Sequence, residues 1–172
     1  MKTKNAGTAK VDELLTILRK EITRRGPNLD ETDLAELAAS MAKTLPRSGE
    51  NRTAKQVGPF YEESTVAKWI GISRQAVKKR ADTNKILVCI TGEGDRLYPT
   101  WQFTDDGQVL PGLKTVLAAL AEGKQDGWTV GLWLTTPDDD LGGATAVQWL
   151  KAGKTVEPIL RDARHDAARW AA

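Results

Sequence analysis

The sequence predicts a mainly α-helical protein with an N-terminal helical hairpin, a small winged helix-turn-helix with one β-hairpin, and an all-helical C-terminal domain. Two observations predict this class. Apolar residues recur at helical spacing through most of the chain, and glycine or proline ends most of these patterns. Strand-like runs flank a single turn, "TGEGD". We expect three segments, residues 1–58, 59–100 and 101–172.

The first segment contains two amphipathic helices followed by a linker. The first helix ends at "RRGP", and the second has Asp30 or Thr32 as its cap and stops before Pro46. Two helices alone bury too little surface to offset the ordering of their backbone. Their apolar faces therefore need the next segment or a second copy of the chain, and we favour a homodimer. The stretch "RSGENRTAKQVG" lacks apolar periodicity and predicts a linker. The apolar positions are Val11, Leu14, Leu15, Leu18 and Ile22 in one helix, and Leu34, Leu37, Ala38, Met41 and Leu45 in the other.

The second segment carries a helix-turn-helix pattern. A helix from about Glu63 to Ile70 is interrupted by "GIS", and Ser73 can cap a second helix, "RQAVKKRAD". Ala67 is small enough for close helix packing, and Gly71 permits the positive φ of a sharp turn. The strands "KILVCI" and "RLYP" follow, as in winged-helix DNA-binding proteins. Because Arg80 stands where an aliphatic residue often returns to the core, we expect Ile86 or Leu87 to close the core instead.

Positive charge is concentrated in this second segment. Between Lys68 and Lys85, six cationic side chains face a single carboxylate, Asp82. Arginine and glutamine can read bases through paired hydrogen bonds, whereas lysines more often hold phosphates. We therefore expect double-stranded DNA as a partner and an outward-facing second helix. Pairing of its cations with acidic neighbours would contradict that orientation. The expected DNA-binding residues are Ser73, Arg74, Gln75, Lys78, Lys79, Arg80, Lys85 and Arg96.

The third segment holds five of the six tryptophans and predicts four short helices. Pro111 and Gly123 bound the first helix, and Pro137 closes the second. The third ends at Gly153, and Thr155 can cap the last. The tryptophans mostly fall on apolar stripes and predict core or interface packing. Trp170, three residues from the end, either closes the domain or anchors a partner, and we favour the domain.

Several blocks in the third segment resemble the toxin-binding region of the Xre/MbcA/ParS antitoxin family. In order they are "YPTWQF", "VLPGLKTVLAAL", "GWTVGLWLTTPDDDLGG", "AVQWLKAG" and "VEPILRDA", over roughly residues 98–167. The resemblance implies a RES-domain toxin as partner and a DNA-binding domain that represses the chain's own operon. Partner contacts are expected at Trp133, Trp149, Arg161, Arg164 and Trp170.

Composition excludes other classes of protein. Apolar residues make up 40% and charged residues 28%, which is ordinary for a globular chain. No run approaches the roughly 20 apolar residues of a membrane span, and no apolar segment follows the N-terminal lysines as in a secretory signal. We expect a cytoplasmic protein with a buried thiol at Cys89. No catalytic group of nucleophile, base and orienting residue can be assembled, so we expect no enzymatic activity and no cofactor. We also expect no metal site, because the consecutive carboxylates of Asp138, Asp139 and Asp140 cannot all converge on one ion.

Three hypotheses follow from the sequence. The first is an antitoxin of a type II toxin-antitoxin system that neutralises a RES-type toxin and represses its operon. The second is a stand-alone transcriptional regulator of a phage or mobile element, with no toxin partner. The third is a protein-interaction module whose basic face is only solvated surface. Phosphate contacts make affinity fall steeply with salt, so salt dependence of DNA binding separates the first two from the third.

Overall fold

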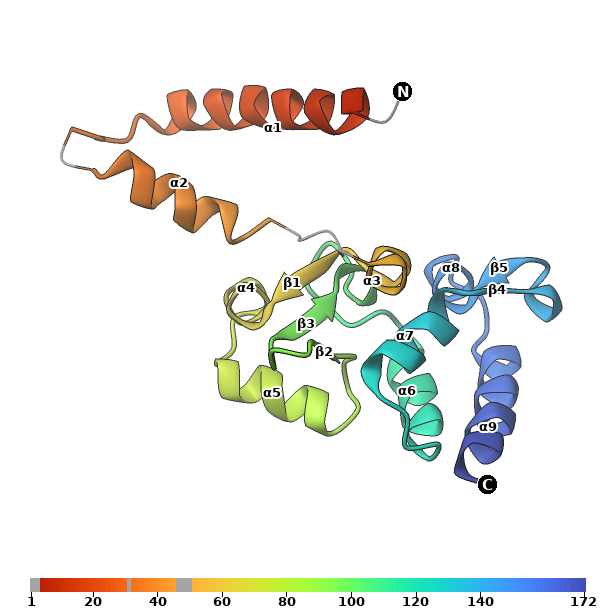
Figure 1. Cartoon of the computed structure of the whole chain (residues 1–172). Coiled ribbons are helices and arrows are strands. Elements are labelled where there is room, and N and C mark those ends of the chain that lie inside the picture. Colours follow the sequence, from red (N-terminus) through yellow and green to blue (C-terminus); the bar gives the residue numbers. More distant parts are fainter. Residues whose placement is uncertain (1–3, 31, 46–50) are drawn as a thin grey trace. The chain divides into compact units, whose positions relative to one another are not determined.

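The computed structural model describes residues 4–30, 32–45 and 51–172 (Figure 1). The structure is mainly helical with a small antiparallel sheet, which confirms the predicted fold class. The chain divides into two compact units, residues 1–40 and 41–172. Within the described ranges, no helix combines the length and the apolar character that crossing a membrane requires.

The first unit contains both predicted helices. Helix α1 (Lys4–Arg25) ends where Gly26 takes a φ of 57° and donates its N–H to the Ile22 carbonyl at 3.1 Å. Helix α2 (Leu34–Ala42) begins after Asp33, whose carboxylate accepts the N–H groups of residues 35 and 36. Asp33 is therefore the cap, in place of the predicted Asp30 or Thr32. No side chain described between residues 9 and 40 is buried.

The stretch predicted as a linker contains a helix. Asn51 caps helix α3 (Arg52–Val57) by accepting the N–H of Ala54 at 2.8 Å. Ala54 and Val57 are buried beside Phe60 and Cys89. The linker prediction was wrong because these two apolar residues, three positions apart, suffice for one docked turn of helix. Residues 47–50 of that stretch lie outside the described residues.

A three-stranded antiparallel sheet supports the helix-turn-helix. Its order is β1 (Phe60–Glu62), β3 (Arg96–Pro99), β2 (Cys89–Ile90), and Cys89 lies opposite Leu97. The last two strands form the predicted hairpin, whereas β1 was not predicted because its three residues run directly into a helix. Helices α4 (Glu63–Ile70) and α5 (Arg74–Asp82) pack on each other beside this sheet (Figure 1).

The interior of the helix-turn-helix is apolar. Ile86 closes this core, which is one of the two predicted possibilities. Leu87, the alternative, is buried in the core of the C-terminal helices instead. The buried side chains of the helix-turn-helix core are Val66, Ala67, Val77, Ala81, Ile86, Tyr98 and Phe103.

The C-terminal part contains the four predicted helices, α6 (Leu113–Ala121), α7 (Gly127–Thr135), α8 (Ala146–Lys151) and α9 (Glu157–Ala171). Helices α6 and α9 pack on each other over a shared core (Figure 1). Two 3₁₀ turns, η1 (Thr100–Gln102) and η2 (Asp139–Leu141), are added to the predicted pattern. A two-stranded ribbon of β4 (Pro137–Asp138) and β5 (Ala144–Thr145) also departs from the all-helical expectation for this part.

The predicted cap of α9 was wrong. No side chain caps this helix, and the Thr155 carbonyl instead accepts the indole N–H of Trp149 at 2.8 Å.

Close contacts join the helix-turn-helix to the C-terminal helices, so residue 100 is not a domain boundary. The Trp101 indole donates to the Val57 carbonyl at 2.6 Å. The fully buried Gln102 side chain accepts the Leu87 N–H at 2.7 Å and donates to the Leu87 carbonyl at 2.9 Å. At the start of α7, a Cβ on Gly127 would lie 1.8 Å from the Val88 carbonyl oxygen, so only glycine fits this approach. Residues 59–100 and 101–172 thus belong to one compact unit.

Cys89 is fully buried, and its thiol donates to the Gly127 carbonyl at 3.4 Å. Burial, and secondly the charge of Asp126, raise the pKa of this thiol to about 12. Because the thiolate is the reactive form, we expect no reaction of Cys89 with Ellman's reagent at pH 8 in the folded protein and full reaction in denaturant. Rapid labelling of the native protein would contradict this burial.

Candidate nucleic-acid interface

The turn between α4 and α5 has the geometry that the sequence predicts. Gly71 adopts a φ of 70°, a left-handed conformation that glycine takes without strain, and Ile72 donates its N–H to the Ala67 carbonyl at 3.0 Å. Ser73 then caps α5 by accepting the N–H of Ala76 at 3.1 Å. The turn and cap are confirmed, and they fix the direction in which α5 projects its side chains.

The outer face of α5 carries Gln75, Lys78 and Lys79, all exposed. In the described part of the chain, no carboxylate pairs with either lysine and no hydrogen bond engages the Gln75 amide. Val77 and Ala81 lie on the opposite face and are buried. The helix thus holds a glutamine and two uncompensated cations toward solvent, the side-chain types that contact bases and phosphates.

Arg74 behaves differently from the prediction, because it points at an acidic neighbour. Its Nε donates to the Glu63 carboxylate at 3.1 Å, although the side chain remains 70% exposed. Because the Arg74 guanidinium is exposed while Glu63 is only 15% exposed, Arg74 can exchange this carboxylate for another anion. Arg74 is therefore partly neutralised in the free protein, which contradicts the outward, unpaired orientation expected of it.

Arg96 is held inside an ion-pair network and does not form part of the exposed basic face. Its guanidinium lies 3.5 Å from Glu63 and donates to Asp82 at 3.0 Å and to the Tyr98 hydroxyl at 3.3 Å. Burial lowers the pKa of Arg96, but these hydrogen bonds outweigh burial and raise it overall. With its side chain only 20% exposed, Arg96 links β3 to α4 and α5, so it is not the exposed, unpaired cation that a DNA contact requires.

Arg80 and Lys85, the two predicted cations not yet described, line a cavity of about 320 Å³ beside α5. Lys114, from the first turn of α6, lines the same cavity, as do Ile70 and residues 107–109. No carboxylate among the described residues pairs with these three cations. Sequence reasoning missed Lys114 because it stands 29 positions beyond Lys85, in a segment with an acidic balance.

The turn of the β-hairpin, which would be the wing of a winged helix, is poorly suited to contact DNA. Between β2 and β3 it exposes Glu93 and Asp95, and the Thr91 hydroxyl accepts the N–H of Asp95 at 3.1 Å. Carboxylates at this turn repel phosphates. The candidate interface therefore consists of α5 and its cationic flank, without the hairpin tip.

The predicted partner residues lie on the C-terminal helices in different settings. The Trp133 indole donates to Asp166 at 2.8 Å, and Trp149 stacks under the Lys154 ammonium at 3.9 Å. Trp170 is partly buried against the core, and a Cβ on Gly123 would lie 2.8 Å from its ring. The sequence left two roles open for Trp170, closing the domain or anchoring a partner, and this packing agrees with the first.

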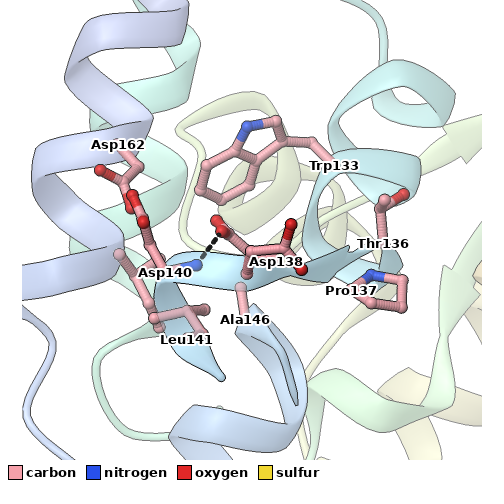
Figure 2. A pocket seen from close by; sticks show the side chains of 10 residues that line it. Trp133, Thr136, Pro137, Asp138, Asp140, Leu141, Ala146 and Asp162 are labelled. Atoms are coloured by element: carbon pink, nitrogen blue, oxygen red, sulfur yellow. Dashed lines mark hydrogen bonds between the residues drawn. The ribbon is translucent and has the colours of Figure 1, made fainter. Parts of the chain in front are cut away.

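An acidic cavity of about 480 Å³ lies beside Trp133 (Figure 2). Figure 2 shows Asp138 and Asp140 from the β4 region and Asp162 from α9 around the indole, with the Asp140 N–H donating to Asp138 at 2.9 Å. Arg161 pairs with Asp162 at 3.1 Å, and Arg164 is exposed on the same helix. The structure thus groups Trp133 with carboxylates and places Trp149 and Trp170 elsewhere on this part.

The chain matches no family model and no curated protein. Among solved structures it is similar to the NMR structure of a protein named Rv2175c, with a TM-score of 0.55 and 26% sequence identity. The match covers 64% of this chain and 82% of that one, and it shows a shared fold.

Proposed function

We propose that this protein binds double-stranded DNA through α5 and regulates transcription. The observation that carries the proposal is the row of cations on and beside α5 that no carboxylate of the described residues neutralises: Lys78, Lys79, Arg80, Lys85 and Lys114. A solvated surface helix commonly balances its cations with acidic residues one turn away, whereas α5 carries only Asp82, which pairs with Arg96.

The capped start of α5 gives the proposal its orientation. In helix-turn-helix proteins the second helix enters the major groove with its N-terminal residues toward the base edges. Gln75 is the second residue of α5 and can bond an adenine through its amide, and Lys79 follows on the same face for a phosphate. The cavity formed by Arg80, Lys85 and Lys114 would receive a phosphate of the flanking strand.

The salt dependence of duplex binding tests the proposal. We expect the logarithm of affinity for a mixed-sequence duplex to fall linearly with the logarithm of salt concentration, by about 0.9 per phosphate contacted. Lys114→Ala should reduce that slope by about one, whereas Lys151→Ala, an exposed lysine of α8, should leave it unchanged. Absent binding at low salt, or equal slopes for all three proteins, would reject the interface and favour the protein-interaction module.

A role as antitoxin is a second candidate, supported by one observation. The block "WLTTPDDDLGG", which resembles the antitoxin family most closely, supplies most of the lining of the acidic cavity beside Trp133. An indole among carboxylates suits a cationic side chain of a partner protein. Co-expression with a RES-domain protein encoded next to this gene should give a complex and restore growth. DNA binding without any complex would favour the stand-alone regulator.

A further inference from the structure

A largely exposed apolar stripe runs along α1. Val11, Leu15, Leu18 and Ile22 follow one another at intervals of four, three and four residues, the spacing of a two-stranded coiled-coil seam. Val11 is 54%, Leu15 56% and Ile22 38% exposed, Leu18 is half-buried, and no described residue between 9 and 40 is fully buried. Such a stripe on a helix of 22 residues leaves apolar surface in water unless another helix covers it.

The charges beside the stripe indicate what covers it. Asp12 follows Val11 and Arg19 follows Leu18, so both flank the stripe on the same side. In the described part of α1, Arg24 pairs with Glu21 at 2.6 Å, whereas neither Asp12 nor Arg19 has an ion-pair partner. The two charges have opposite signs and lie seven residues apart, too far along one helix to meet.

We propose that α1 pairs with α1 of a second copy of this chain, in antiparallel orientation. In that register Val11 packs against Ile22 of the second copy, and Leu15 against its Leu18. Asp12 of each copy then lies beside Arg19 of the other, which gives two equivalent ion pairs across the seam. A parallel pair would place Arg19 beside Leu14 and bring no opposite charges together.

The pairing gives the assembly two copies of α5. If α5 binds DNA as proposed above, a dimer binds two half-sites of a palindromic operator. Only this consequence rests on the proposed function. The pairing itself can be measured without DNA, so its failure and the failure of DNA binding are distinguishable.

Sedimentation equilibrium of the full chain tests the dimer, with variants on and off the stripe. The unchanged protein should dimerise in a concentration-dependent way, and Leu15→Asp should be monomeric. Ile17→Asp is the matched control, because Ile17 is 54% exposed on α1 but lies outside the stripe, and it should dimerise as the unchanged protein does. A monomer at all concentrations for the unchanged protein would overturn the proposal and leave α2 of the same chain or another protein as the occupant.

Charge reversal tests the orientation and guards against variants that only unfold α1. Asp12→Arg and Arg19→Asp should each weaken the dimer by about tenfold, because each change puts like charges side by side at two places. The double variant D12R/R19D restores both pairs with their signs exchanged, and it should regain the original dimerisation constant. A dimer insensitive to both single reversals, or a double variant as weak as the singles, would overturn the antiparallel register.

Discussion

Gln102→Leu is expected to lower the free energy of unfolding of residues 41–172 by about 2–6 kcal/mol. The Gln102 side chain is fully buried and bonds both the N–H and the carbonyl of Leu87. Leucine fills a similar volume but leaves both backbone groups buried without partners, and each such group costs about 1–3 kcal/mol. Domains of this size are stable by only about 5–15 kcal/mol, so the loss should be evident in urea unfolding.

Gln108→Leu provides the control for this change. Gln108 is an exposed glutamine in the same connecting segment, and no hydrogen bond of its side chain is seen among the described residues. Its replacement should shift the free energy of unfolding by no more than about 0.5 kcal/mol. Equal stability of the two variants would mean that the helix-turn-helix and the C-terminal helices are not joined through Gln102.

Gln75→Ala and Lys79→Ala are expected to affect DNA binding in different ways. Losing a good base contact costs about 1–3 kcal/mol, so Gln75→Ala should bind a selected site more weakly while its affinity for random duplex stays the same. Lys79→Ala should weaken both complexes alike, because a phosphate contact carries no sequence information. Competition titrations with selected and random duplexes measure, for each variant, the ratio of its two affinities.

Arg74 gives a third comparison on the same helix. The sequence predicts a base contact for Arg74 equal in kind to that of Gln75, but its pair with Glu63 must first be released or rearranged. We therefore expect Arg74→Ala to lose less discrimination than Gln75→Ala. Identical effects of Gln75→Ala and Lys79→Ala on both duplexes would contradict the orientation assigned to α5.

Local features of the fold could be predicted from the sequence because their causes are local. The spacing of Ala67 and Gly71 and the capping residue Ser73 determine α4, the turn and α5 through contacts within a few residues. The third strand and the single compact unit could not be predicted in this way. They depend on contacts across long separations, such as Trp101 with Val57 and Gly127 with Val88.

Most residues of the candidate site could be predicted from the sequence, but their ion pairs and their arrangement in space could not. Clustering of positive charge in the sequence located Lys78, Lys79, Arg80 and Lys85, yet it could not show which cations are neutralised. Arg96 was expected to contact DNA as well, but the fold brings Glu63 and Asp82 to it from two helices. Lys114 was missed for the converse reason, because only the tertiary fold brings it to the cavity that Arg80 and Lys85 line.

Backbone amide chemical-shift mapping of the protein during titration with a short duplex tests the central claim most directly. We expect the largest shifts in residues 73–85 and near Lys114, with little change at Glu93 and Asp95 or along α9. Shifts concentrated on α8 and α9, with α5 unchanged, would contradict the claim that α5 is the surface that meets DNA.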